Sequence, residues 1–373
     1  MANVINFDNN ATTKLCKEAL AKMTEVYEYS YNPSSGHALG RAGSMIVETA
    51  RMDISDALNA TNYEIFFTGG GTESNNMALF SDDYEEILFA KFEHSSIYNT
   101  RPKCAKITEI GVTKDGIIDV EELKSKIEGL SGKNFLVSLM YSNSETGTIQ
   151  PLKEVTQLVH QKGGLIHSDL VQSCGKIKVD LENLNVDFAS ISSHKINGPQ
   201  GVGAFFARRG LDVQPIIFGG GQERGKRSGT LNVAGIAGFG YCMAKLDEKL
   251  EKMNEIVKIR DFIEKEVKKI AGNNVKIFGE NVDRVKNTSF FALKKADSQT
   301  QMIHFDLNGF AVSGGSACSS GSTKPSRVVE AMNVGDEFKS AVRISLCAEN
   351  TMDEAKKFIE VFEKYYEKIS KDY

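Results

Sequence analysis

The stretch EIFFTGGGTESNN, residues 64–76, decides the fold class of this 373-residue chain. A short apolar run ends in three glycines and continues into residues that favour a helix. This order is typical of a β-strand that turns tightly into an α-helix. It predicts a βα unit, the building block of a parallel sheet.

The same pattern recurs between residues 60 and 210. Helix-like segments such as PLKEVTQLVHQKG, residues 151–163, separate short apolar runs. The runs are EIFFTG, EILFAK, FLVSLMYSN, GLIHSD, DFASISS and GAFFARR. Their alternation predicts an α/β fold with a large, mostly parallel sheet.

The last third of the chain has a different pattern. A charged stretch at residues 245–272 has apolar residues at three- and four-residue spacing, which predicts a long helix joining two domains. The runs VKIFG, TSFFAL, GFAVSGG and AVRISL and the terminal MDEAKKFIEVFEKYYEKI predict a small α+β domain. We expect residues 1–14 to join that domain, with a large domain at 15–250 and the small domain at 251–373.

Composition excludes several classes of function. The net charge of −4, with 41% hydrophobic and 25% charged residues, gives no electrostatic reason to bind nucleic acid. The N-terminus lacks a signal-like pattern and no apolar run is long enough to span a membrane, so we expect a cytoplasmic protein. Six cysteines without a CxxC pair argue against a disulfide framework and a cysteine metal site.

Ligands of open α/β sheets bind beyond the carboxyl ends of the strands. Polar residues that follow the apolar runs are therefore the first candidates for a site. They are Thr72, His94, Asn143, Asp169, His194 and Lys195.

Three of these positions have two interpretations each. The glycine turn before Thr72 can direct backbone N–H groups at a phosphate, or it can be a tight turn that Thr72 caps. Asp169 can cap a helix or pair with a buried cation such as a protonated pyridine nitrogen. Lys195 can be a solvated loop residue, but beside a phosphate site and Asp169 it has the surroundings that an aldimine cofactor requires.

Several motifs occur in order along essentially the whole chain: NFDNNATT, YNPSSGH, FTGGGTESNN, EHSS, NSETG, SDLVQS, SSHKINGPQGVG, GGGQERGKRSGT, SGGSACSS and VRISL. With them the sequence resembles the cysteine desulfurases of the NifS/IscS type, which are related to class V aminotransferases. The resemblance implies a fold-type I pyridoxal-phosphate (PLP) transferase with a seven-stranded sheet. It also implies conversion of L-cysteine to L-alanine, with transfer of sulfur to an enzyme cysteine.

The resemblance assigns roles to individual residues. Lys195 would form the Schiff base, Asp169 would pair with the pyridine nitrogen, and His94 would stack on the ring and assist proton transfer. Further cofactor contacts would come from Gln172 to the phenolic oxygen, from Gly71, Thr72, Ser192 and His194 to the phosphate, and from Thr230 to the phosphate of the other subunit of a homodimer.

Substrate and sulfur contacts follow from the same resemblance. Arg343 would take the substrate carboxylate, with Asn143 and Ser144 beside it. Cys318 lies among Gly, Ser and Thr residues, a composition that predicts a mobile segment. The resemblance implies that Cys318 carries the persulfide to an acceptor such as an iron–sulfur scaffold protein.

The sequence departs from the family pattern at Ser144, Val171, Gln222 and Cys347. Ser144 replaces an asparagine that usually helps to grip the substrate carboxylate, so we expect Arg343 to hold it largely alone. Selenocysteine lysis or amino-group transfer is one alternative function, although transamination has no use for Cys318. A non-catalytic sulfur-relay or scaffold-binding protein is another, against which the cofactor residues argue.

Overall fold

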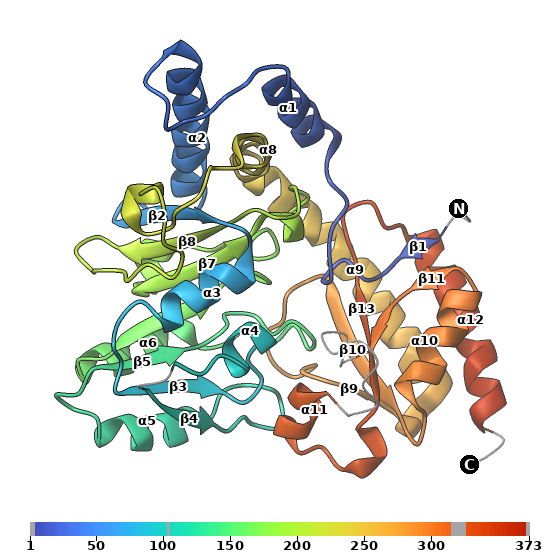
Figure 1. Ribbon diagram of the computed structural model, residues 1–373. Coiled ribbons are helices and arrows are strands. Elements are labelled where there is room, and N and C mark those ends of the chain that lie inside the picture. The colour runs from blue at the N-terminus through green and yellow to red at the C-terminus, as the bar shows by residue number, and fades with distance from the viewer. Residues whose placement is uncertain (1–3, 103–104, 315–325, 371–373) are drawn as a thin grey trace.

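The computed structural model describes residues 4–102, 105–314 and 326–370. Cys318, the predicted persulfide carrier, lies outside these residues. Figure 1 shows a large α/β part beside a smaller part that contains the last strands and helices together with the N-terminal strand.

A seven-stranded sheet forms the centre of the large part, and it confirms the predicted α/β class. Its strands lie in the order β2 (Tyr63–Thr68), β8 (Gly203–Arg208), β7 (Phe188–Ser192), β6 (Leu165–Asp169), β5 (Phe135–Ser138), β3 (Glu86–Ala90) and β4 (Lys106–Ile110). Only β8 runs antiparallel to its neighbours in this sheet, and the other pairs are parallel. All residues of β3 and β5 are buried, as expected for strands that are covered on both faces.

Helices cover this sheet and extend above it (Figure 1). They are α1 (Lys17–Tyr27), α2 (Ala38–Ala57), α3 (Gly71–Leu79), α4 (Ser95–Tyr98), α5 (Val120–Glu128), α6 (Leu152–Gln161), α7 (Leu181–Leu184) and α8 (Val233–Ala244). Small residues let α2 approach α8 closely, because a Cβ atom at Gly240 would lie 2.6 Å from that of Ala50. Among the helices of the described residues, none is long and apolar enough to cross a membrane.

The smaller part begins after α9 (Leu246–Ala271), the long charged helix that the sequence predicts. An antiparallel sheet of β12 (Ser313–Gly314), β13 (Ala341–Ser345), β10 (Thr288–Leu293) and β9 (Val275–Ile277) packs with α10 (Ser298–Leu307), α11 (Arg327–Met332) and α12 (Met352–Ile369). The buried face of α12 includes Ala355, Phe358 and Phe362, which recur at helical spacing.

The N-terminal segment connects the two parts. Strand β1 (Ile5–Asn6) pairs with β11 (Phe310–Ala311), and Asp8 then forms a bridge with Ser345 of the small sheet. A few residues later the backbone N–H of Thr13 donates to the carbonyl of His194 at 2.9 Å. Residues 9–12 therefore lie between the small sheet and the end of β7. The division at residues 14 and 250 itself stays a prediction.

Candidate active site

A cavity of about 370 Å³ lies at the carboxyl ends of β2, β6 and β7, against the small sheet. Most of the predicted site residues line it. They are Gly71, Thr72, His94, Ser144, Asp169, Gln172, Ser192, His194, Lys195 and Arg343. Six further lining residues were missed by sequence reasoning: Asn10, Ala11, Asn75, Ser96, Met140 and Ser142.

The glycine turn after β2 presents the first turn of α3 to this cavity. N–H groups in the first turn of a helix have no partner within the helix, and they favour an anion. Gly70, with φ +143°, is the N-cap and makes no side-chain cap, so the interpretation of Thr72 as the cap is wrong. β8 runs close to the turn, because a Cβ at Gly203 would lie 2.7 Å from Gly70 Cα.

Asp169, the last residue of β6, is buried and held by two donors. Its Oδ1 accepts from the backbone N–H of Val171 at 2.9 Å, and its Oδ2 accepts from Asn75 Nδ2 at 2.7 Å. The carboxylate is thus fixed at the cavity wall. Asn75 belongs to α3. The one feature of the sequence that could have indicated its role is that a polar residue occupies the buried face of this helix.

Asn75 also connects Asp169 to His94. Its Nδ2 lies 2.8 Å from Ser96 Oγ, which lies 2.7 Å from Nδ1 of His94. The same Nδ1 accepts from the backbone N–H of Ser96 at 3.2 Å. A neutral His94 ring therefore carries its proton on Nε2.

Lys195 ends the short 3₁₀ helix η1 (Ser193–Lys195), directly after β7. Its Nζ donates to the carbonyl oxygens of Asn10 at 2.6 Å and Ala11 at 2.7 Å. Nδ1 of the neighbouring His194 lies 3.1 Å from Thr12 Oγ1. Burial, together with the charge of Lys195, lowers the pKa of His194 to about 4. His194 is therefore neutral at pH 7.

A second lysine, Lys176, lies behind the cavity wall and was also missed. Its Nζ donates to Oδ1 of Asn10 at 2.6 Å and to Oε1 of Gln172. Nε2 of Gln172 donates to the carbonyl of Asn10 at 3.0 Å. Asn10 therefore meets both Lys195 and Lys176.

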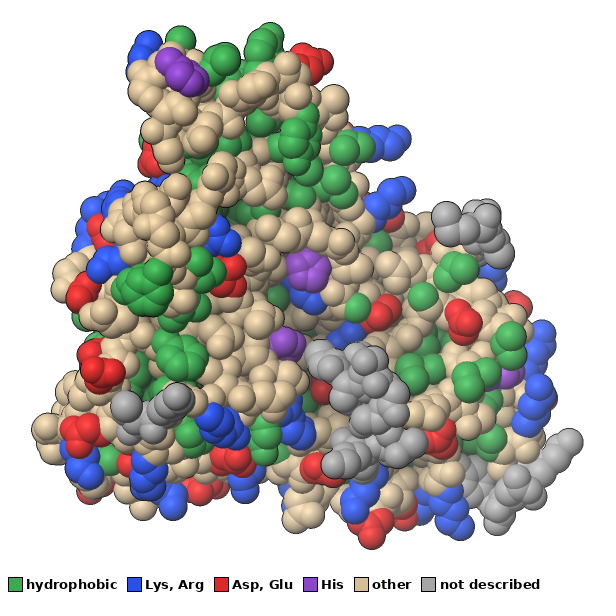
Figure 2. Space-filling view, in the orientation of Figure 1, with side chains coloured by type: hydrophobic (Ala, Val, Ile, Leu, Met, Phe, Trp, Pro, Cys, Tyr) green, Lys and Arg blue, Asp and Glu red, His purple; other side chains and the backbone are tan. Residues whose placement is uncertain are grey.

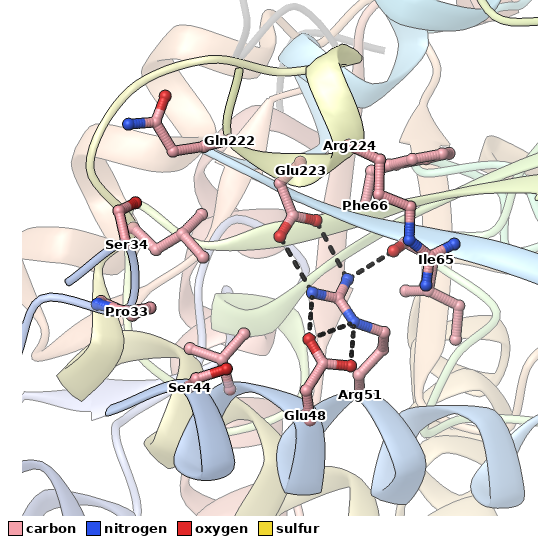
Figure 3. Close-up of a pocket in the computed structure, with 12 residues that line it drawn as sticks. Pro33, Ser34, Ser44, Glu48, Arg51, Ile65, Phe66, Gln222, Glu223 and Arg224 are labelled. Carbon is pink, nitrogen blue, oxygen red and sulfur yellow. Dashed lines mark hydrogen bonds and ion pairs between the residues drawn. The ribbon is translucent and has the colours of Figure 1, made fainter. Parts of the chain in front are cut away.

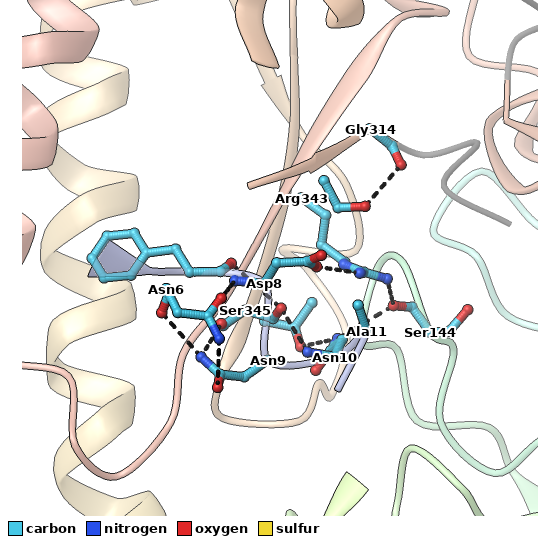
Figure 4. A network of polar contacts seen from close by, with 12 residues as sticks. Asn6, Asp8, Asn9, Asn10, Ala11, Ser144, Gly314, Arg343 and Ser345 are labelled. Atoms are coloured by element: carbon cyan, nitrogen blue, oxygen red, sulfur yellow. Dashed lines mark hydrogen bonds and ion pairs between the residues drawn. The ribbon is translucent and has the colours of Figure 1, made fainter. Parts of the chain in front are cut away.

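Arg343, on β13, brings the small sheet to the cavity. Nη2 donates to Asp8 Oδ1 at 2.6 Å and Nη1 to the carbonyl of Ser144 at 2.9 Å, as Figure 4 shows. Nδ2 of Asn10 lies 3.3 Å from the same Ser144 carbonyl. Arg343 and Ser144, both predicted to meet the substrate carboxylate, thus lie side by side.

Of the predicted site residues that the structure describes, two do not line the cavity. Asn143 is buried, and its Oδ1 accepts from the N–H groups of Glu145 at 2.9 Å and Thr146 at 3.0 Å. It stabilises the turn that carries Ser144, and its contact with substrate stays a prediction. Thr230 is exposed in the loop before α8. Its predicted role in the other subunit likewise stays a prediction.

The departures from the family pattern lie in different places. Val171 lines the cavity, next to Gly71. Gln222 does not line it, and its Oε1 accepts from the N–H of Gly229 at 2.8 Å within the loop. Cys347 also lies outside the cavity lining, and burial raises the pKa of its thiol to about 12.

Known proteins resemble the chain over nearly its whole length. A family model described as aminotransferase class-V matches residues 5–358. A protein from Dictyoglomus turgidum named cysteine desulfurase IscS is 36% identical, over 99% of this chain and 96% of that protein. A protein of the same name from Clostridium botulinum is 34% identical, over 98% and 94%. The X-ray structure of a NifS-like protein from Rickettsia africae has a TM-score of 0.91 at 36% identity, covering 98% of this chain and 99% of that one.

Proposed function

The chain belongs to the class-V aminotransferase family and is a cysteine desulfurase of the IscS and NifS type, and on that premise we propose how its residues work. The reaction converts L-cysteine to L-alanine, with the sulfur retained on Cys318. The comparisons do not favour selenocysteine lysis, amino-group transfer or a non-catalytic sulfur relay.

Enzymes of this family generally use pyridoxal 5′-phosphate, and the cavity of this chain fits that cofactor. The observation that carries the proposal is the meeting of an amine, a carboxylate and a helix N-terminus around one cavity of about 370 Å³. The first turn of α3, at Gly71 and Thr72, would hold the phosphate. Asp169 would pair with the pyridine nitrogen, and Lys195 would supply the amine that links the cofactor to the protein.

The remaining contacts complete this arrangement. Ser192 and His194 would add to the phosphate site, Gln172 would meet the phenolic oxygen, and His94 would lie against the ring. The bound cofactor would draw electrons from the α-carbon of an amino-acid substrate.

The protein's own groups orient the substrate and move protons. Arg343 would bind the substrate carboxylate through its planar guanidinium, with Ser144 beside it. Lys195, as a free amine, would take the α-proton. A neutral His94 would offer the proton on its Nε2, because Ser96 occupies its Nδ1.

Sulfur leaves the substrate by attack of the Cys318 thiolate. A bond forms between the Cys318 sulfur and the substrate sulfur, and the bond between that sulfur and the substrate β-carbon breaks. The three-carbon remainder gains protons and leaves as alanine. The outer sulfur of the Cys318 persulfide then passes to an acceptor thiol. We propose that this thiol belongs to an iron–sulfur scaffold protein.

A homodimer would complete the site through Thr230. The loop before Thr230 is anchored by Glu223, which accepts from Arg51 of α2 at 2.9 Å (Figure 3). Glu223 also accepts from the backbone N–H of Phe67 at 2.7 Å. Green side chains gather over the α1 and α2 region at the top of Figure 2. Exposed apolar residues of these two helices and the segments next to them are Leu20, Tyr27, Tyr29, Leu39, Met45 and Met52. Such a surface favours a second copy of the chain as its partner.

We also propose a cytoplasmic location, on the strength of family membership.

The test is to add L-cysteine to the purified protein and to measure sulfide and alanine in the presence of a thiol reductant. Absorbance of the purified protein reports bound PLP. The Cys318→Ser variant is expected to keep PLP and to lose both products. Cys347→Ser is the matched control and should keep parental rates, because this thiol lies outside the cavity lining. Parental sulfide release by Cys318→Ser would disprove the persulfide step.

A further inference from the structure

Lys176 is a buried lysine, and within the described residues its amine meets only neutral acceptors. The residue is 5% exposed. Its Nζ donates to the amide oxygens of Asn10 and Gln172, and no carboxylate within the described residues forms an ion pair with it. Burying an ammonium without a counter-ion is costly. Burial and the charges of Lys195, Arg343 and Lys249 accordingly lower the pKa of Lys176 well below its usual range.

Lys176 Nζ is the donor in both contacts, so an amide oxygen, and not an amide nitrogen, faces it in Asn10 and in Gln172. Lys176 therefore dictates which end of each neighbouring amide faces it. In Gln172 the oxygen must face Lys176, so Nε2 must point the other way, where it donates to the Asn10 carbonyl at 3.0 Å. An amide without such a neighbour can turn over and exchange its donor for its acceptor.

The same rule fixes Asn10. Its Oδ1 faces Lys176 and also accepts from Asn287 Nδ2 at 3.2 Å. Its Nδ2 is left to donate to Thr288 Oγ1 at 2.9 Å and to the Ser144 carbonyl at 3.3 Å. The backbone carbonyl of Asn10 then accepts from Lys195 at 2.6 Å. One buried lysine thus orients two amides on the cavity wall.

We propose that Lys176 is a positioning residue, which fixes Gln172 with its amide donor toward the cavity side and its oxygen away from it. This inference rests on the proposed PLP site, because the group that would use the Gln172 donor is the phenolic oxygen of the cofactor. Lys176 itself does not line the cavity. Its effect on the cofactor must therefore pass through the residues that do.

The test is a double-variant cycle on cofactor-free protein titrated with PLP, with the dissociation constant read from absorbance. Lys176→Met keeps the length of the side chain and removes its donors. We expect it to weaken PLP binding about tenfold, the size of one lost oriented hydrogen bond. In the Gln172→Leu background, the same change should have almost no effect. Lys178→Met removes an exposed lysine two residues away and is the matched control, with parental affinity.

A second variant keeps the proposal testable if Lys176→Met folds poorly. Gln172→Glu preserves an oxygen for Lys176 but removes the donor, so it should weaken PLP binding as much as Gln172→Leu while its thermal midpoint rises through the new ion pair. If Lys176→Met lost the same PLP affinity in the parental and the Gln172→Leu backgrounds, Lys176 would act by its charge alone and the positioning role would be overturned. Parental PLP affinity in Gln172→Glu would overturn it as well. If the parent protein bound no PLP, the proposed function and this inference would fail together. If the parent bound PLP and Lys176→Met lost equal affinity in both backgrounds, only this inference would fail.

Discussion

Arg343, which lines the cavity, forms an ion pair with Asp8, with 2.6 Å between Nη2 and Oδ1. Asp8 therefore occupies one position of the guanidinium that we assign to the substrate carboxylate. A carboxylate that enters must share Arg343 with Asp8 or displace it.

Arg343→Lys should raise the KM for L-cysteine, because lysine cannot offer two parallel donors. We expect KM to rise about 10- to 100-fold, which corresponds to the loss of one charge-assisted hydrogen bond, and kcat to change less. Asp8→Asn is the companion variant and should lower KM, since it removes the competing carboxylate. Steady-state alanine formation measures both constants. An unchanged KM in Arg343→Lys would exclude Arg343 as the carboxylate site.

Asp169→Asn should keep the cofactor but slow the reaction. A neighbouring carboxylate typically raises the pKa of a basic group by about 1 to 3 units, so its loss should lower kcat about 10- to 1000-fold. Asn75→Ala should have a milder effect, because Asp169 keeps the bond from the Val171 N–H. Alanine formation, normalised to PLP content, is the measurement. Parental kcat in fully loaded Asp169→Asn would contradict the assignment.

Glu223 and Glu48 both bind Arg51 but differ in exposure (Figure 3). The side chain of Glu223 is 2% exposed and that of Glu48 is 56% exposed. Glu223→Gln removes the buried partner and leaves Arg51 with only the exposed Glu48, so it should lower the free energy of unfolding by about 3 kcal/mol. Glu48→Gln should lower it by less than about 1 kcal/mol. Urea denaturation of the two variants measures the difference, and equal losses would show that burial does not set the strength of this network.

Sequence patterns predicted the strands of the large sheet because buried strands are continuous apolar runs. They missed β4, an edge strand whose residues are mostly half-buried or exposed, so that it lacks such a run. The antiparallel direction of β8 was not predicted either, since apolar content does not encode direction. Only the pairing with β2 and β7 reveals it.

Part of the site could be predicted for a related reason. Asp169 and Lys195 follow neighbouring parallel strands, whose ends must meet at one edge of the sheet. Asn10 could not be found this way, because it reaches Lys195 only through the packing of the N-terminal segment between the two parts. Lys176 lies in GKIKVD, where alternation with apolar residues suggests a solvent-facing lysine. Its burial depends on the folded N-terminal segment.

The free energy of unfolding should fall as the pH drops below about 6.5. Burial lowers the pKa of His167 to about 3, and His194 has a pKa lowered to about 4 by burial and by Lys195. An unfolded chain protonates histidines near pH 6.5, so between that pH and the folded values the unfolded state binds more protons. Stability is therefore complete above about pH 6.5 and declines below it, by at most about 1.4 kcal/mol per pH unit for each buried histidine.

His167 dominates this dependence because it is fully buried, between Ser138 Oγ and Ser190 Oγ at 2.9 Å each. His167→Gln should flatten the slope between pH 6 and 4.5 by about 1.4 kcal/mol per pH unit, because glutamine does not titrate. Urea denaturation of cofactor-free protein at several pH values measures the slope. His194→Gln should flatten it less, since that ring is only half-buried and water screens part of its charge. If His167→Gln kept the parental slope, the imidazole would already be protonated in the folded protein, and another group would cause the loss of stability.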